Sequence, residues 1–117
     1  MSQAYDRQGQ PITLEEAGRL HKDHKYVVVK QETVGVYWIS TVWLGYDHRH
    51  GSGPPVIFET MVFERGPAGI REEYRGLRTL VDDTYHEWNE VDGRRYCTEA
   101  EALAGHAAMV EEWSRPR

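Results

Sequence analysis

Two dense runs of β-branched and aromatic residues dominate the middle of the chain, and a polar loop separates them. The first run covers 36–46 and the second 56–64, while the loop between them contains two glycines and two prolines. β-branched and aromatic side chains suit a pleated, half-buried surface, and glycine and proline favour turns. The pattern predicts a central antiparallel hairpin. A further strand is predicted over about 26–32, with Val34-Gly35 as the turn that joins it to the hairpin.

The pairing of the predicted strands follows from their hydrophobic alternation. If Tyr46 lies opposite Val56, then Leu44 lies opposite Phe58, and the register of the preceding hairpin agrees with this choice. One face of the sheet, which we expect to be the core face, then holds Val27, Val29, Val36, Val42, Leu44, Phe58 and Val62. The other face holds Tyr37, Ile39, Thr41, Trp43, Glu59, Met61 and Phe63.

Helical periodicity flanks this sheet on both sides. Thr13 and Thr98 each precede a Glu at the third following position, a capping-box pattern that opens predicted helices over about 13–24 and 98–114. Gly66-Pro67 is expected to break the sheet, and apolar residues at helical spacing predict a helix over about 69–82. Asp92-Gly93 predicts the turn of a second hairpin over 84–97. The class is α+β, an antiparallel meander with helices packed on the sheet, in a single domain over 1–117.

Composition narrows the classes of function. The chain of 117 residues has a formal charge of −5, which argues against non-specific nucleic-acid binding and against binding to anionic membranes. A local basic pocket for a small anionic ligand stays open. Cys97 is the only cysteine, and neither a signal peptide nor a membrane span is evident, so we expect a cytoplasmic protein without an internal disulfide. No motif for a cofactor is present, and none is predicted.

The loop segment Asp47-His48-Arg49-His50 is the densest group of polar side chains. A His-X-His pair on an extended segment presents both imidazoles to the same side, so His48 and His50 are weak candidates for metal ligands. No third ligand is fixed by spacing. The simpler alternative is a solvated loop.

Glu59 is a single acid within an apolar strand and is expected opposite Trp43. A buried carboxylate needs a partner, so Glu59 is either a ligand-orienting group or general base near His48 or His106, or one half of an ion pair with an arginine. His106 follows Gly105 on the predicted last helix, and glycine there suggests that something approaches the backbone closely. His106 is therefore either a functional histidine or a hydrogen-bonded histidine of the core.

Three stretches resemble a family of small uncharacterised proteins of phages and prophages, especially of actinobacteria. These stretches are 40–48 (STVWLGYDH), 53–63 (GPPVIFETMVF) and 96–106 (YCTEAEALAGH). The resemblance covers most of the chain, implies a viral or mobile-element origin, and assigns no reaction. Relative to that family, 66–90 has the character of an insertion. The motif positions that could form a shared site are Trp43, Asp47, His48, Glu59, Thr60 and His106, to which the adjacent Arg49 is added as a candidate for an anionic ligand.

These observations leave three functional hypotheses. The first is a non-enzymatic binding protein, acting in counter-defence by sequestering a small, nucleotide-like ligand or by blocking a host protein. The second is a small metal-dependent or acid/base hydrolase that uses the loop 47–50 and Glu59. The third is a structural or assembly protein. Because apolar and aromatic side chains fall on both faces of the predicted sheet, we also expect a homodimer or a larger assembly.

Overall fold

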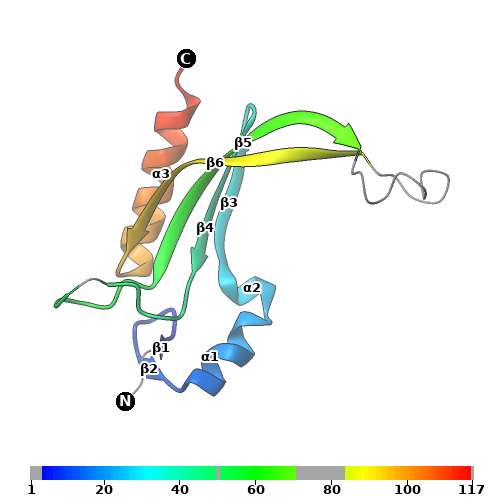
Figure 1. Ribbon diagram of the computed structural model, residues 1–117. Helices are drawn as coiled ribbons and strands as arrows, with labels where there is room; N and C mark the ends of the chain where they lie inside the picture. The colour runs from blue at the N-terminus through cyan, green and yellow to red at the C-terminus, as the bar shows by residue number, and fades with distance from the viewer. Residues whose placement is uncertain (1–3, 50, 71–83, 117) are drawn as a thin grey trace.

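The chain folds into a four-stranded antiparallel sheet with one long helix across one face. The computed structural model describes residues 4–49, 51–70 and 84–116, with the side chains of 67–70 and 84–87 excepted (Figure 1). The elements are β1 (Ala4–Tyr5), β2 (Pro11–Ile12), α1 (Leu14–His21), α2 (His24–Val27), β3 (Val28–Val34), β4 (Tyr37–Trp43), β5 (Phe58–Ile70), β6 (Thr84–Tyr96) and α3 (Glu99–Ser114). The main sheet has the order β3-β4-β5-β6, and β1 pairs with β2. This confirms the α+β meander.

Helix α3 packs against all four strands of the sheet, whereas α1 and α2 lie at one end of it (Figure 1). Both predicted N-caps are present. The hydroxyl of Thr13 accepts the amide of Glu16 at 3.0 Å, and the hydroxyl of Thr98 accepts the amide of Glu101 at 3.1 Å. The second box is complete, since Glu101 accepts the amide of Thr98 in return. In the first box the Glu16 carboxylate pairs with Arg19 instead.

Residues 26 and 27, predicted to begin a strand, belong to the short helix α2. The turn before β4 is Gly35-Val36 rather than Val34-Gly35, and Val34 lies opposite Tyr37. A bulge between Val28 and Lys30 then shifts the rest of this pairing. A φ of 59° at Gly35 explains the difference, because this left-handed conformation suits glycine at the first turn position.

The predicted register of the central hairpin is wrong by one residue. Trp43, not Leu44, lies opposite Phe58. Strand β4 ends at Trp43. The amide of Leu44 still donates to the carbonyl of Ile57, but Gly45 accepts the amide of Tyr5 and Tyr46 bridges Ala4, so these two residues pair with the N-terminal segment. Gly45 permits this departure with a φ of 81°. Because side chains alternate with a period of two, the slip inverts β4 relative to β5.

The core therefore lies on the face that the sequence analysis assigned to the outside of β4. Seven of its fully buried apolar residues form two clusters, one of which also packs against α1 and the N-terminal segment. One cluster contains Trp43, Ile57, Phe58 and Ala102, and the other contains Ile39, Val62 and Met109. The helical spacing of Leu103, His106, Ala107, Val110 and Trp113 predicts that these residues form the buried stripe of the last helix. This prediction is partly wrong, since Leu103 is exposed and Ala102 and Met109 are buried.

Neither predicted interruption of the last two strands occurs. Strand β6 runs through Asp92-Gly93 without a turn, since Asp92 lies opposite Val62 and Gly93 opposite Met61. A bulge lies one residue earlier, at Val91, between the pairs Val62–Asp92 and Phe63–Glu90. Strand β5 continues past Gly66-Pro67 to Ile70 with a register shift, which accommodates a proline that cannot donate to the ladder. The predicted helix 69–82 is thus wrong at its first two residues, and its remainder lies outside the described residues. The described ends of the segment 66–90, at 66–70 and 84–90, belong to β5 and β6 and extend this hairpin, whose outer part leaves the sheet on the side away from α3 (Figure 1).

Within the described part of the chain, no helix is long and apolar enough to cross a membrane.

Candidate functional site

The residues proposed from sequence do not converge on one site. They divide among the hydrophobic core (Trp43), the loop after β4 (Asp47, His48, Arg49), a buried polar network (Thr60, His106) and the sheet face opposite α3 (Glu59). His50 lies outside the described residues. Each place has its own chemistry.

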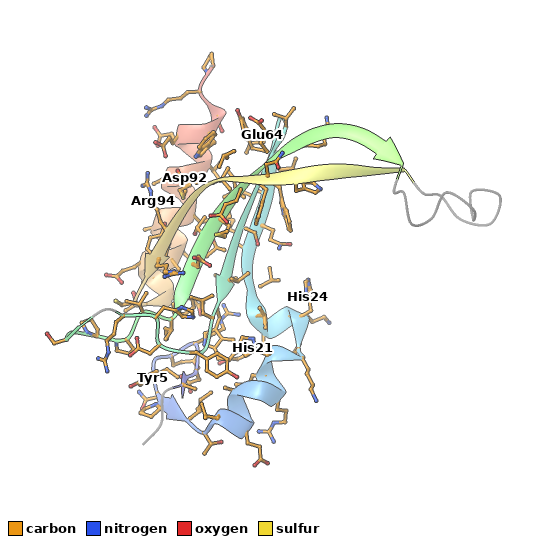
Figure 2. All side chains as sticks on the ribbon, viewed as in Figure 1. Tyr5, His21, His24, Glu64, Asp92 and Arg94 are labelled. Atoms are coloured by element: carbon orange, nitrogen blue, oxygen red, sulfur yellow. The ribbon has the colours of Figure 1, made fainter. Side chains whose placement is uncertain are left out.

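Trp43 anchors the N-terminal segment to the core. Its indole Nε1–H donates to the carbonyl oxygen of Tyr5 at 2.9 Å, and His21 stacks on its ring at a centroid distance of 4.7 Å. Tyr26 meets the same ring edge-on at 4.9 Å. Figure 2 places Tyr5 and His21 beside this end of the sheet. Trp43 is fully buried and lies opposite Phe58, whereas Glu59 lies opposite Val42, so Trp43 and Glu59 do not share the site suggested by their motif positions.

Asp47 closes the loop that follows β4. One carboxylate oxygen accepts the amides of Arg49 and Val56 at 2.9 and 3.0 Å, and the other lies 2.6 Å from Nε of Arg49. Burial tends to raise the pKa of Asp47, but the two amides and the positive charge of Arg49 outweigh it and hold that pKa below its ordinary value. Arg49 also donates to the carbonyl of Gly53. Asp47 and Arg49 therefore serve the loop itself.

His48 is half-buried, and its backbone amide donates to the carbonyl of Val56 at 2.9 Å. Among the residues that the structure describes, no three His, Cys, Asp or Glu side chains are grouped closely enough to hold a metal ion. The described loop thus adds no support for the metal site proposed at His48 and His50.

A chain of hydrogen bonds runs through the core beneath α3. The hydroxyls of Thr60 and Thr41, which lie opposite each other on β5 and β4, are 2.5 Å apart. The Thr41 hydroxyl is 2.6 Å from Nδ1 of His106, and Nε2 of His106 is 3.0 Å from a carboxylate oxygen of Glu32 on β3. With Nε2 protonated, His106 donates to Glu32 and accepts from Thr41, so every bond in the chain has a donor and an acceptor.

This order of carboxylate, imidazole and hydroxyl matches that of a nucleophilic triad. Thr41 and His106 are both completely buried, however, so a substrate has no access to the hydroxyl. The network satisfies polar groups within the core, and the alternative of a hydrogen-bonded core histidine is the one observed. Sequence reasoning missed Glu32 and Thr41, although polar side chains at alternate positions of neighbouring strands were the available signal.

The buried network predicts a pH dependence of stability. Burial lowers the pKa of His106, against the opposing effect of Glu32 and with a small contribution from Lys30. The folded protein thus binds this proton less tightly than the unfolded chain, whose histidine titrates near about pH 6.5. We expect the free energy of unfolding to fall as the pH drops from neutral through this value. Urea denaturation across this range checks it, and His106→Gln, which cannot titrate, should show a smaller slope. Asp47 does not interfere, because its pKa is lowered from an ordinary value that is already well below that of histidine.

The sheet face opposite α3, here called the open face, carries a row of aromatic rings. Trp38 on β4 lies opposite Phe63 on β5, and their rings stack at 5.3 Å. Trp88 on β6 meets Trp38 at 5.8 Å, although β5 separates their strands in the sheet. The three rings therefore form a continuous row across three strands. Sequence analysis missed it because the wrong register assigned Trp43 to this face in place of Trp38.

Polar and apolar side chains surround this aromatic row. Glu59 lies opposite Arg95, and the two form an ion pair at 3.0 Å, the alternative that sequence analysis had set against a catalytic role. The amide of Gln31 donates to the hydroxyl of Ser40 at 2.9 Å. Met61 lies between these groups and the row and is half-buried. Among the described residues no helix lies over this face, since α3 packs on the opposite one (Figure 1).

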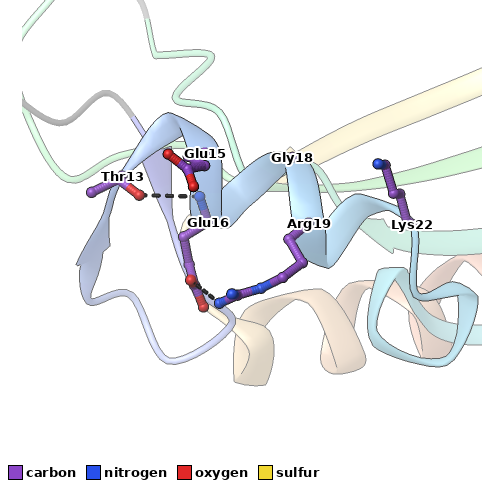
Figure 3. A pocket seen from close by; sticks show the side chains of 6 residues that line it. All are labelled: Thr13, Glu15, Glu16, Gly18, Arg19 and Lys22. Atoms are coloured by element: carbon purple, nitrogen blue, oxygen red, sulfur yellow. Dashed lines mark hydrogen bonds and ion pairs between the residues drawn. The ribbon is translucent and has the colours of Figure 1, made fainter.

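A separate hollow lies beside α1 (Figure 3). Its lining residues are Thr13, Glu15, Glu16, Gly18, Arg19 and Lys22. Thr13 caps the helix and Glu16 pairs with Arg19, so these groups serve α1 itself. None of the residues predicted to form a site lies there.

Comparisons with protein-family models, with curated proteins and with solved structures gave no significant match.

Proposed function

We propose that this chain is a non-enzymatic protein-binding module and that its open face is the docking surface. The observation that carries the proposal is the row of Trp38, Phe63 and Trp88 on a sheet face that α3 leaves uncovered. Aromatic residues, methionine and arginine are enriched at protein interfaces, and tryptophan is among the residues enriched at energetic hot spots. Met61 and Arg95 beside the row complete this composition.

A protein fits this face better than a nucleic acid does. Aromatic rows also stack on bases, but such surfaces combine stacking with a positively charged groove. The open face instead balances its charges, with Glu59 and Glu90 against Arg65 and Arg95, and the whole chain has a net charge of −5. Catalysis is disfavoured by the burial of Thr41 and His106, the pair with the most reactive arrangement.

The resemblance to phage and prophage proteins suggests the setting. We place the protein in the cytoplasm of an infected bacterium, where a docking surface of this kind suits the blocking of a host protein or the assembly of a viral one. The hydrolase alternative gains no support from the described residues, because Asp47 and Glu59 are both engaged in ion pairs.

Site-specific photocross-linking tests the proposal. A photoreactive amino acid is placed at Trp88 on the open face or at Leu103 on α3, two apolar side chains that are 42% and 41% exposed. The matched exposure means that unspecific collisions should label both positions equally. In the cell that naturally carries the gene, we expect a discrete cross-linked protein from position 88 and none from position 103. Equal labelling from both positions, or none from position 88, would contradict the proposal.

A further inference from the structure

The outward side chains of β5 have an unusual order. Between the two ends of the sheet, the residues that face away from α3 are Glu59, Met61, Phe63 and Arg65. An acid stands at one end, a base at the other, and two apolar side chains lie between them. This order has an apolar centre and a charged rim, which is the usual anatomy of a protein interface.

The same four side chains are also complementary to a second copy of β5 that runs in the opposite direction. Consider a second copy whose open face packs on the open face of the first. The two-fold axis lies between the two sheets, perpendicular to the strands, and crosses β5 between Met61 and Phe63. Position 59 of each copy then lies over position 65 of the other. Each Glu59 then meets an Arg65, and each Met61 meets a Phe63. Methionine sulfur against an aromatic ring is a favourable contact. A two-fold interface requires this kind of self-complementarity, because residue i of one copy contacts j of the other and j contacts i.

The charge of the open face also favours a second copy of the chain as the partner. Its two acids and two bases, Glu59 and Glu90 with Arg65 and Arg95, cancel, whereas the chain as a whole carries −5. Two acidic molecules repel through most of their surfaces, and a neutral, charge-patterned face reduces that repulsion. Resting on the proposed docking role of the open face, we infer that its partner is a second copy of this chain, packed face to face as a two-fold dimer.

A pair of complementary charge reversals tests this arrangement. Glu59→Arg places two arginines opposite each other in a dimer of the variant, and Arg65→Glu places two glutamates opposite each other. We expect each variant alone to dissociate at least about tenfold more readily than the wild type. In an equimolar mixture, the arginine introduced into one chain meets the glutamate introduced into the other. The unchanged Arg65 of the first chain still meets the unchanged Glu59 of the second, so the mixed dimer should form.

Sedimentation velocity at micromolar concentrations gives the masses, and native mass spectrometry identifies the mixed dimer. Glu111→Arg on α3, whose side chain is 76% exposed, is the control and should leave the mass unchanged. Circular dichroism checks the fold of each variant, since Glu59→Arg also removes the pair with Arg95. A dimeric wild type, weakened by each reversal and restored in the mixture, supports the inference.

A monomeric wild type, reversals without effect, or a mixture that stays monomeric would each overturn it. Cross-linking from position 88 tests the proposed docking role independently of the dimer. If the wild type is monomeric but position 88 still cross-links to a different protein, the second copy is excluded and the docking role stands. If position 88 gives no cross-link while the dimer persists in both reversed variants, the open face has neither role.

Discussion

Replacement of Trp43 by alanine should cost about 3–5 kcal/mol of folding stability, among the largest losses expected for one substitution in this chain. Trp43 is the largest of the fully buried side chains, and its indole also holds the carbonyl of Tyr5. The variant would leave a cavity at the junction of the sheet, α1 and the N-terminal segment. Since a domain of this size has about 5–15 kcal/mol in total, urea denaturation followed by circular dichroism should show a clear shift of the midpoint.

Two other substitutions at tryptophan separate the contribution of the hydrogen bond from that of burial in the core. Trp43→Phe keeps a ring in the core but removes the donor to Tyr5, so we expect a smaller loss, with about 1 kcal/mol from the hydrogen bond. Trp88→Ala on the open face should change stability by less than about 1 kcal/mol, because the side chain is largely exposed. An equal cost at Trp43 and Trp88 would show that the two faces of the sheet are wrongly assigned.

Gly105→Ala should destabilise the protein, although the same change in a helix interior usually stabilises it by about 1 kcal/mol. An added Cβ at Gly105 would lie 2.2 Å from the ring of Tyr96, which packs directly against this turn of α3. Neither the ring nor the helix backbone can move without disturbing the core. We expect a net loss of about 1–3 kcal/mol in urea denaturation.

Two comparisons make this prediction specific. Gly18→Ala in α1 meets no atom within 4 Å and should stabilise the protein by about 0.5–1 kcal/mol. Removal of the ring by Tyr96→Ala should abolish the cost of Gly105→Ala, so that the double variant is at least as stable as Tyr96→Ala alone. If Gly105→Ala and Gly18→Ala both stabilise, the close packing of Tyr96 against α3 is refuted.

Features that depend on neighbouring residues were predictable from the sequence. The caps of α1 and α3 are local hydrogen bonds between Thr13 or Thr98 and a residue three positions later, so the pattern alone identifies them. A close approach of another group to Gly105 was also predictable, although its partner was not. Glycine lowers the stability of a helix relative to alanine, so its presence within an amphipathic helix indicates that a larger side chain would not fit.

The register of the central hairpin was not predictable, because it depends on a contact distant in sequence. Tyr46 pairs with Ala4 instead of Val56, so the strand ends earlier than its β-branched composition indicates. A one-residue error then exchanges Trp43 and Trp38 between the core and the open face. Asp92-Gly93 is likewise compatible with either a turn or a continuous strand, and pairing with β5 decides between them.

For the candidate site, too, individual residues were predictable from the sequence, but their long-range partners were not. The two alternatives for Glu59 were correctly drawn, and the arginine partner is Arg95, but no spacing rule connects residues on different strands. The partners of His106 were hidden for the same reason, since Glu32 and Thr41 reach it from β3 and β4. Sequence identified the residue types that matter, and the long-range pairing determined which of them meet.

The irregular outer strands have a consequence for the form that assembly can take. Strand β3 has a bulge between Val28 and Lys30 and carries the ion pair of Lys30 and Glu32, while β6 departs from regular pairing at Val91 and again between Trp88 and His86. An incoming strand needs an even row of free amides and carbonyls, which neither border supplies. Growth of the sheet from molecule to molecule, and with it fibre formation, is thereby discouraged. Contact through the open face, as in the proposed two-fold dimer, would by contrast close on itself after two copies.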